Sequence, residues 1–273
     1  ASARTAFDDG RWAGKPPAVR KKILLRFAEK ILAAKDELAL LETLDMGKPI
    51  QYSLAVDVPS AARCIAWYAE AVDKIYDEVA PTAANALALI TREPMGVVGV
   101  IVPWNFPINL SFTGLIYTFA AGNRAMVKMS ENSRHLARLL IERMPDYFPP
   151  EKLQVFDETG GVGVAFSQLK FDHLLFTGSG PTGRAVMAAA AQNLCPVTLE
   201  LGGKAPAILC DDFPLRMAVE RIMFVKLLNA GQICTTVDHA WLRAGKADEF
   251  ISLARGIVAK RYPQLSSLDY TSI

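Results

Sequence analysis

The sequence predicts an α/β fold in which a doubly wound, five-stranded parallel sheet is followed by a partial second α/β domain. Short apolar runs typical of buried strands alternate along the chain with segments of helical periodicity. One such run leads into a glycine turn, Gly178-x-Gly180-x-x-Gly183, and an alanine-rich helical segment follows it. The next run ends in a carboxylate, Glu200. We expect the first domain to span residues 1–202 and the second to begin within 203–273.

Length and composition place the chain among globular proteins. It has 273 residues, of which 51% are hydrophobic and 21% are charged, and its formal net charge is +2. This length is enough for one large domain or two, and the nearly neutral charge argues against a nucleic-acid partner. The longest apolar stretches, such as 97–102, are far too short to cross a bilayer, so no membrane partner is expected.

The N-terminus and the cysteines bear on the compartment. The first residues lack the apolar core of a secretory signal, so no targeting segment is expected. The cysteines are sparse and none forms a Cys-x-x-Cys pair, which argues against a disulfide framework or a metal site. A reducing cytoplasm fits this pattern. The cysteines are Cys64, Cys195, Cys210 and Cys234.

The N-terminal third of the chain is expected to be helical. Apolar residues recur at helical spacing over 17–47, which predicts one long helix or two joined helices. A second helical stretch, interrupted near Pro59, extends to about residue 76 and carries Trp67 and Tyr68, which we expect in the core. Residues 77–93 then turn into a β-like run. They predict a projecting hairpin of the kind that pairs with another subunit.

Five apolar runs are predicted to form the parallel sheet. The first, 97–102, ends in a stiff turn in which Pro103 and Pro107 lie on either side of Asn105. Open α/β sheets place ligands at the carboxyl ends of their strands, where this turn would lie. The amide of Asn105 either donates to an oxyanion or simply stabilises the turn. The strands are expected to begin near Val97, Ala125, Leu153, Asp172 and Val197.

Two further features follow the fourth and fifth predicted strands. The glycine turn is typical of dinucleotide binding, because a helix N-terminus there presents unpaired N–H groups to a pyrophosphate. It is equally compatible with a tight strand-to-helix turn. Glu200 follows Gly178 by about 20 residues, a spacing that suits a carboxylate on an adenosine ribose. A carboxylate before paired glycines also suits a general base, and spacing alone leaves the choice open.

A cysteine follows these features along the chain. Cys234 comes after Gly231-Gln232-Ile233, at the end of the helix predicted to start near Pro214. A single cysteine is usually a small buried hydrophobe. A thiol and a carboxylate downstream of a nucleotide-type turn instead indicate covalent capture of an electrophile next to a hydride acceptor.

Five motifs, taken in chain order, carry a resemblance to a known family. They are Pro103-Trp104-Asn105-Phe106-Pro107, Lys128-Met129-Ser130-Glu131, Phe176-Thr177-Gly178-Ser179 through Gly183, Glu200-Leu201-Gly202-Gly203-Lys204 and Gly231-Gln232-Ile233-Cys234. The chain resembles the NAD(P)-dependent aldehyde dehydrogenase superfamily over most of its length. The run from Pro196 to Glu200 is similar to the coniferyl aldehyde dehydrogenase and class 3 branch. The resemblance implies that the predicted sheet is a Rossmann-like cofactor domain.

The resemblance implies chemical roles for three residues. Cys234 would attack the aldehyde carbon to form a thiohemiacetal, which becomes a thioester when hydride passes to the nicotinamide. Asn105 and the backbone N–H of Cys234 would hold the developing oxyanion. Glu200 would be the general base that activates water to hydrolyse the thioester to a carboxylic acid. The implied substrate is an aldehyde, and the branch favours an aromatic one similar to coniferyl aldehyde.

The resemblance also implies a cofactor site. Lys128 and Glu131 would face the adenosine ribose, and Ser179 and Trp104 would lie near the pyrophosphate. Glu131 would bond a 2′-hydroxyl and repel a 2′-phosphate, which favours NAD; Lys128 would offset part of that repulsion, so NADP stays open. The residues expected to contact the cofactor are Trp104, Lys128, Glu131, Gly178, Ser179 and Gly183.

One part of the family pattern does not occur in this sequence. The later motif Glu-x-Phe-Gly-Pro is absent after Cys234, and so is the remainder of a catalytic domain. The resemblance therefore implies a C-terminally truncated chain whose full-length form is a homodimer or homotetramer. Two functions remain open: an aldehyde dehydrogenase, of which this fragment alone need not be active, and a nucleotide-binding module without turnover.

Overall fold

The centre of the structure is a parallel sheet whose strands lie in the order β5-β4-β3-β6-β7. The computed structural model describes residues 1–264 and 266–272. All five strands begin within one residue of the expected positions, so the predicted α/β class is confirmed. Their bounds are β3 (Val97–Ile101), β4 (Arg124–Lys128), β5 (Leu153–Phe156), β6 (His173–Gly178) and β7 (Val197–Leu201).

The strand order shows where the winding of the chain reverses. β3 pairs in parallel with β4 on one side and with β6 on the other. The chain therefore winds outward to β5 and then returns past β3 to form β6 and β7. In doubly wound sheets, ligands bind outside the carboxyl ends of the strands at such a reversal. Here those two ends lead into Pro103 after β3 and Ser179 after β6.

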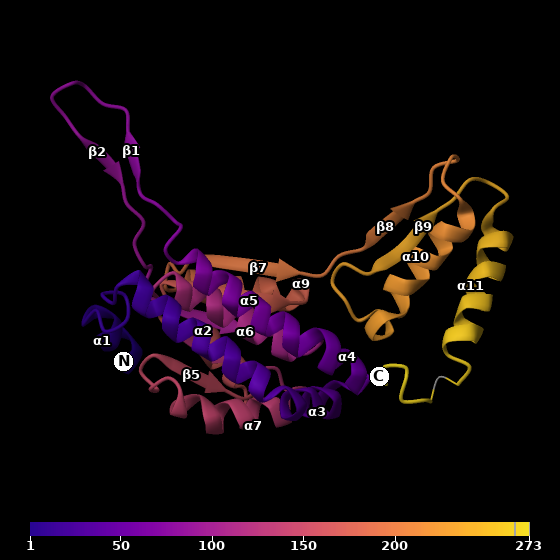
Figure 1. Cartoon of the computed structure of the whole chain (residues 1–273), viewed down its shortest axis with the longest axis horizontal. Helices are drawn as coiled ribbons and strands as arrows, with labels where there is room; N and C mark the ends of the chain where they lie inside the picture. Colours follow the sequence, from indigo (N-terminus) through magenta and orange to yellow (C-terminus); the bar gives the residue numbers. More distant parts are fainter. Residues whose placement is uncertain (265, 273) are drawn as a thin grey trace.

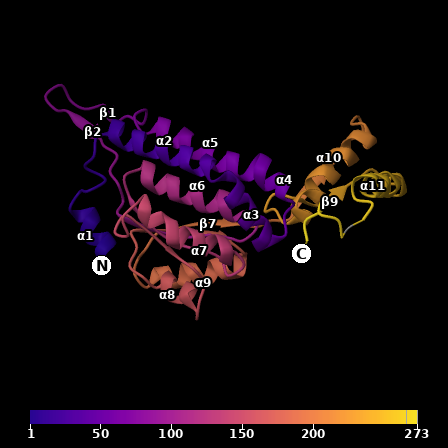
Figure 2. The same ribbon diagram turned by 60° about the horizontal axis from the view of Figure 1, so that its bottom comes forward.

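Helices cover both faces of the sheet, as Figure 2 shows. On one face, α6 and α7 contact the sheet, and α2, α3 and α5 form an outer layer; we call this the α6 face. On the other, the α9 face, lie α1, α8 and α9. These helices are α1 (Ser2–Asp8), α2 (Pro17–Ala33), α3 (Lys35–Met46), α5 (Val58–Ala71), α6 (Pro107–Ala120), α7 (Arg134–Arg143), α8 (Val162–Ser167) and α9 (Gly180–Ala191).

Alternation along β3 shows why the sheet has a core on each side. Val98 and Val100 pack with the helices of the α6 face, whereas Val97 and Ile101 pack with those of the α9 face. All residues of β3 are buried because the strand is central and covered on both faces. A strand buried in this way has the continuous apolar run that predicted it.

The N-terminal helices agree with the predictions in part. The stretch 17–47 forms two helices, α2 and α3, which meet at Ala34. The short α4 (Ile50–Tyr52) leads into α5 through the π-helical segment η1 (Ser53–Asp57), so regular α-helical geometry is interrupted just before Pro59. Proline has no N–H for the helical hydrogen bonds and its ring crowds the carbonyl one turn earlier, which a wider π-helical turn accommodates. The expectation that Trp67 is a core residue is wrong, since it is 65% exposed.

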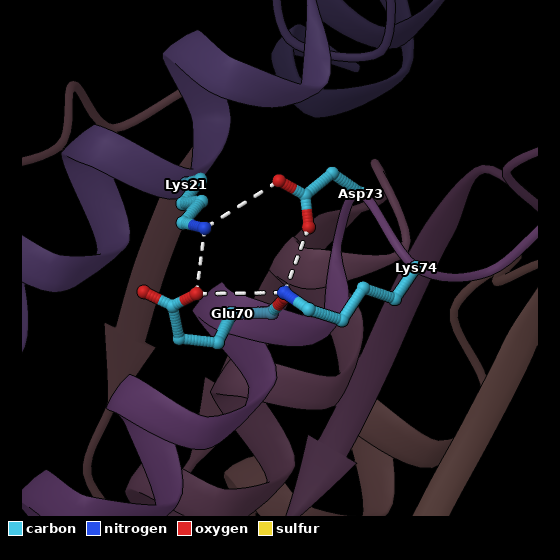
Figure 3. A network of polar contacts seen from close by, with 4 residues as sticks. All are labelled: Lys21, Glu70, Asp73 and Lys74. Carbon is cyan, nitrogen blue, oxygen red and sulfur yellow. Dashed lines mark hydrogen bonds and ion pairs between the residues drawn. The ribbon is translucent and has the colours of Figure 1, made fainter.

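Charged side chains join α2 to the C-terminal end of α5, as Figure 3 shows. Lys21 of α2 lies 2.6 Å from a Glu70 oxygen and 3.4 Å from an Asp73 oxygen. Lys74 lies 3.1 Å from Asp73 and 3.5 Å from Glu70. The hydrogen bond to Glu70 is the main cause that raises the pKa of Lys21. These contacts hold the last turn of α5 in place just before the hairpin leaves the domain.

The predicted hairpin is present and projects from the body of the domain (Figure 1). It consists of β1 (Glu78–Ala80) and β2 (Ala88–Ile90), which pair antiparallel. Val79 and Leu89 face each other across the ladder and both are exposed. A projecting apolar ribbon is the kind of element that another subunit covers, and this role stays a prediction.

The chain after β7 forms a separate α/β unit, set apart from the main sheet in Figure 1. Its two strands pair in parallel, and a helix connects them. Its elements are β8 (Ala205–Ile208), α10 (Leu215–Leu227), the short 3₁₀ helix η3 (Leu228–Gly231), β9 (Val237–Trp241) and α11 (Ala247–Arg261).

Within 1–264 and 266–272, no helix has the length and apolar character needed to span a membrane.

Candidate active site

A cavity of about 1010 Å³ lies on the α6 face, above β6 and β7. Cys234, Glu200 and Asn105, which come from three distant parts of the sequence, all line it. Trp104, Gly178 and Ser179 lie at its margin too. The structure therefore brings together six of the nine predicted site residues. The remaining three, Lys128, Glu131 and Gly183, are not among the lining residues.

Glu200 is directed into this cavity by the pleat of β7. It pairs with Thr177 of β6, and both side chains point to the α6 face. Its neighbour Leu199 points the other way and packs in the core of the α9 face. Glu200 is exposed because the helices of the α6 face lie over β3 and β4 rather than over β7. The carboxylate is therefore open to water, as a general base requires.

Tyr117 of α6 lines the same cavity. The pKa of Tyr117 is raised to about 12, mainly by burial and also by the neighbouring Tyr68 and the charge of Glu200. Its hydroxyl is therefore protonated at neutral pH. A protonated phenol can donate a hydrogen bond.

Cys234 lies in a loop and not at the end of a helix, so that expectation is wrong. The helix α10 ends at Leu227, and the chain then passes through η3 before it reaches the thiol. Asn229 and Ala230 have φ values of 51° and 52°, and Gly231 has 79°. Successive left-handed residues cannot continue a right-handed helix. They reverse the chain and leave Cys234 exposed at the cavity.

A group of hydrogen bonds connects the Asn105 turn to the Cys234 loop. The Asn105 side-chain amide donates to the carbonyl oxygen of Gln232 at 2.9 Å. The amide of Asn229 donates to the carbonyls of Asn105 and Gln232, at 3.2 and 3.3 Å. The side chain of Gln232 in turn donates to the carbonyl of Asn229 at 3.1 Å. Buried Asn229 is thus at the centre of this group.

Sequence reasoning did not single out Asn229. A signal was available, because Asn followed shortly by Gly is a common pattern where the backbone turns left-handed. One partner of its side chain, however, is the carbonyl of Asn105, which lies more than a hundred residues away in the sequence. No local pattern in the sequence shows such a contact.

The glycine turn differs from the expected mode of phosphate binding. Ser179 caps α9, and its hydroxyl and carbonyl oxygens accept from the N–H groups of Thr182 and Gly183. Pro181 has no N–H. Among the described residues, the N–H of Gly180 is left without a partner, so fewer donors are available than a helix N-terminus usually offers.

Space rather than backbone conformation explains two of the turn's glycines. A Cβ on Gly183 would come within 2.9 Å of the Leu201 side chain, so glycine lets α9 pack closely on β7. A Cβ on Gly178 would come within 2.6 Å of the Phe176 ring. None of the glycines of this turn has a positive φ, so their backbone conformation does not require glycine.

Lys128 lies across the sheet from the cavity's carboxylate, and Glu131 lies in the turn that follows the same strand. Lys128 is the last residue of β4 and points to the α9 face, where it forms an ion pair with Glu158. Glu158 also accepts from the N–H of Gly163, at 3.0 and 3.2 Å. Glu131 is exposed in the turn after β4, and one of its oxygens lies 3.2 Å from the hydroxyl of Ser130.

Glu158 is a second residue that sequence reasoning missed. Burial raises the pKa of its carboxyl, but hydrogen bonds from Lys128 and Gly163 outweigh that effect, and the pKa lies below its ordinary value. The carboxyl is therefore ionised at neutral pH. Glu158 follows the end of β5, next to β4, so its proximity to Lys128 follows from the strand order.

The candidate residues therefore form two groups on opposite faces of the sheet. Cys234, Glu200 and Asn105 lie on the α6 face, and Lys128 lies on the α9 face. The turn at Ser179 lies at the carboxyl edge between them. A ligand that contacted both groups would have to be extended and cross this edge, as a dinucleotide can.

The residues present fit a nicotinamide dinucleotide. A Cβ built on Gly180 would meet only Arg184, at 3.8 Å, and one built on Gly202 or Gly203 would meet nothing within 4 Å. Open backbone of this kind lets a phosphate approach closely.

Within the part of the chain that the structure describes, no group of three or more His, Cys, Asp or Glu side chains is arranged to hold a metal ion.

The strand order, the glycine turn and the cavity at the reversal of winding define a Rossmann-like α/β protein of the dinucleotide-binding class. Comparison with protein families agrees with this class. The chain belongs to the aldehyde dehydrogenase family, whose model matches residues 1–261.

Relatives of known name are similar over most of this chain. A probable coniferyl aldehyde dehydrogenase of Pseudomonas aeruginosa is 41% identical over 266 residues, which are 94% of this chain and 56% of that protein. A coniferyl aldehyde dehydrogenase of a Pseudomonas species is 46% identical over 190 residues, 69% of this chain and 40% of that protein. The chain spans about half the length of the curated relatives it matches.

Solved structures show the same arrangement. The aldehyde dehydrogenase KauB of Pseudomonas aeruginosa superposes with a TM-score of 0.89 at 41% identity, over 95% of this chain and 54% of that one. An indole-3-acetaldehyde dehydrogenase solved with NAD⁺ superposes with a TM-score of 0.90 at 39% identity, over the same shares.

Proposed function

We propose that this protein oxidises an aldehyde to a carboxylic acid with NAD(P). The single observation that best supports the proposal is that Cys234, Glu200 and Asn105 line one cavity at the reversal of winding, in a chain of the aldehyde dehydrogenase family. Each of the three carries a chemical group that this reaction needs.

Cys234 is the nucleophile. Its thiolate attacks the aldehyde carbon, and the carbonyl oxygen becomes an oxyanion in a tetrahedral thiohemiacetal. A free thiol has a pKa of about 8.5, so only a small fraction of it is ionised at neutral pH. A larger fraction of thiolate requires a neighbouring group that stabilises the anion. The exposure of Cys234 at the cavity supports this role.

Asn105 stabilises the oxyanion together with the backbone N–H of Cys234. One N–H of the Asn105 amide is held by the carbonyl of Gln232, which leaves the second N–H for the substrate oxygen. A donor oriented before the substrate arrives needs no reorganisation during the reaction. Removal of one such donor typically costs about 2.7–4 kcal/mol of barrier.

Glu200 acts after the thiohemiacetal has been oxidised to a thioester. Its carboxylate takes a proton from water as that water attacks the thioester carbon; the C–S bond then breaks, which releases the carboxylic acid and leaves Cys234 as a thiolate and the proton on Glu200. The nicotinamide, when bound, supplies the hydride acceptor for the oxidation. The exposed position of Glu200 on β7 supports its contact with water.

We assign the cofactor to the carboxyl edge of the sheet. Ser179 and Trp104 would lie near its pyrophosphate, beside Gly178, and Gly183 lets α9 approach the sheet there. Lys128 and Glu131 would face the adenosine ribose. We favour NAD over NADP, because carboxylates near that ribose repel a 2′-phosphate.

The substrate class we favour is an aromatic aldehyde. Leu110, Leu175 and Ile233 give the cavity an apolar lining, which suits an aromatic ring. Two of the similar proteins are named coniferyl aldehyde dehydrogenases. Their names support an aromatic substrate of that type for this chain.

Three further expectations remain proposals. Residues 1–202 would form the cofactor domain, and residues from 203 would begin the catalytic domain. The β1–β2 hairpin would join subunits in a homodimer or homotetramer. The four free cysteines among the described residues would suit a reducing compartment such as the cytoplasm.

Substitution of Cys234 tests the proposal. The purified protein is mixed with NAD⁺ and an aromatic aldehyde, and NADH formation is followed for the unchanged chain and for Cys234→Ala. We expect the substitution to abolish NADH formation while NAD⁺ binding, measured by calorimetry, is retained. Turnover by Cys234→Ala would remove the thiol mechanism. Retained NAD⁺ binding without turnover in the unchanged chain would instead favour a nucleotide-binding module.

A further inference from the structure

On the α9 face, Lys128 is expected to face the adenosine ribose, but its ammonium group is already paired with a carboxylate. Lys128 and Glu158 are in contact at the carboxyl ends of the adjacent strands β4 and β5. The Lys128 side chain is only 8% exposed and that of Glu158 is 20% exposed. The ammonium group is therefore committed to a carboxylate before any ligand binds.

Glu158 is itself held in place from a second direction. Both of its oxygens accept from the N–H of Gly163, which lies at the start of α8. A Cβ on Gly163 would come within 2.8 Å of a Glu158 oxygen and 3.3 Å of Lys128 Cε. Gly163 thus leaves the space in which the pair lies. The Gly163 N–H and the Lys128 ammonium therefore both hold the Glu158 carboxylate, and the largely buried pair is part of the packed structure.

We propose that Glu158 determines dinucleotide choice by holding Lys128 in an ion pair, so that NAD is bound in preference to NADP. The inference rests on the proposed function, in which Lys128 and Glu131 face the adenosine ribose. It adds a residue that neither the family resemblance nor the similar proteins assign.

The charges explain the expected preference. A 2′-phosphate carries a charge of about −1.5 to −2 at neutral pH and binds well only where a cation is free to pair with it. Glu158 neutralises Lys128, and Glu131 lies after the same strand as Lys128. The ribose of NAD brings hydroxyl groups instead, which can donate to carboxylates and accept from an ammonium. The same three residues therefore favour NAD and oppose NADP.

Removal of the Glu158 charge tests the proposal. In Glu158→Gln, the side-chain oxygen can still accept from Gly163, but Lys128 loses its anionic partner. We expect the affinity for NADP⁺, measured by calorimetry, to rise about tenfold or more, and that for NAD⁺ to change by less than about threefold. Glu158→Gly removes the carboxylate altogether and gives a second route to the same comparison if the first variant folds poorly.

Asp157→Asn is the matched control. Asp157 precedes Glu158 after β5 and accepts a hydrogen bond from Thr159 at 3.3 Å, and within the described residues the ion pair of Lys128 is with Glu158 rather than with Asp157. The control removes the same unit of charge one position away, so an equal gain in NADP⁺ affinity would show a general field effect and would overturn the proposal. Lys128→Met combined with Glu158→Gln is expected to lose the gain, because the phosphate then has no cation to pair with.

Failure of the inference and failure of the proposed function give different results. If neither dinucleotide binds to the unchanged protein, the proposed function fails. If NAD⁺ binds but the ratio of the two affinities is the same in Glu158→Gln, only the role of Glu158 fails. A preference for NADP⁺ in the unchanged protein would also overturn the inference.

Discussion

Asn105 and Gln232 are joined by a hydrogen bond of 2.9 Å, from the side-chain amide of the first to the main-chain carbonyl of the second. The two residues are 127 positions apart in the chain. One lies in the turn after β3, and the other lies two residues before Cys234. The candidate oxyanion donor and the candidate nucleophile are therefore coupled by the main chain of one loop.

Asn229 is predicted to maintain this coupling. In Asn229→Ala, the carbonyls of Asn105 and Gln232 lose a donor, and alanine is less tolerant of the φ of 51°. We expect a loss of about 1–3 kcal/mol in the free energy of unfolding. A displaced loop should also lower kcat by roughly 100-fold. Urea unfolding and steady-state kinetics measure the two effects, with the KM for NAD⁺ expected to change little.

Two control variants separate the hydrogen bonds of Asn229 from its backbone conformation. Asn229→Gly removes the side chain but adopts a positive φ without strain, so we expect it to lose activity as well. Ala230→Gly relieves the neighbouring left-handed residue, whose φ is 52°, and should leave activity near its original level. Full activity in Asn229→Gly would show that the backbone conformation, and not the amide, matters.

Glu200→Gln is predicted to separate acylation from hydrolysis. The amide keeps the shape of the carboxylate but cannot accept a proton from water. We expect one burst of NADH per site, followed by steady turnover about 100 to 10,000 times slower than in the unchanged protein. Rapid-mixing measurements of NADH check this result. Cys234→Ala is the control that should give neither burst nor turnover, and equal loss of both phases in Glu200→Gln would contradict its role as the base.

A buried ionic group under the Asn105 turn predicts a pH dependence of stability. Lys48 lies 2.7 Å from Asp57 and 3.8 Å from Glu42, and its ammonium lies 3.9 Å from the centre of the Phe106 ring. Glu42 is fully buried, and neither of its oxygens has a hydrogen-bond partner within the described residues. Burial is the main cause that raises the pKa of Glu42 from 4.5 to about 7, although the charge of Lys48 opposes the shift.

The sign of this effect follows from the raised pKa. Protonated Glu42 favours the folded state, so its contribution to the free energy of unfolding is fully present below pH 4.5 and is lost as the pH rises through about 7. Glu42→Gln cannot ionise and should show a smaller decline in stability between about pH 5 and about pH 8. Urea unfolding at about pH 5 and about pH 8 measures this decline in the free energy of unfolding. Glu37→Gln, on the exposed side of the same helix, should decline as the unchanged protein does, and an equal decline in Glu42→Gln would contradict the prediction.

The strands of the sheet were predictable because each one is a local pattern. β3 lies between two layers of helices, so every residue in it is apolar or glycine, and such a run is visible in the sequence. Trp67 was misplaced for a related reason. Helical spacing shows that α5 has two faces but does not show how far the neighbouring helices extend over each one, and Trp67 lies outside that contact.

The site was predictable to the extent that its residues lie in motifs. Cys234, Glu200 and Asn105 were identified from their neighbours in the sequence, and the structure brings all three to one cavity. The contacts of the loop that carries Cys234 were not predicted, because the side chain of Asn229 reaches the carbonyl of the distant Asn105. Those contacts involve main-chain carbonyls, which every residue has and which therefore leave no trace in a motif.

The amino-acid sequence specified the kinds of chemical groups and the order of the elements that carry them, because period, turn residues and strand-end residues are local properties. The tertiary structure determined which of those groups contact one another. Lys128 was expected to face a ribose, and the adjacency of β4 and β5 pairs it with Glu158. The strength of a charge interaction depends on distance and burial, and both are properties of the packed structure rather than of any single segment.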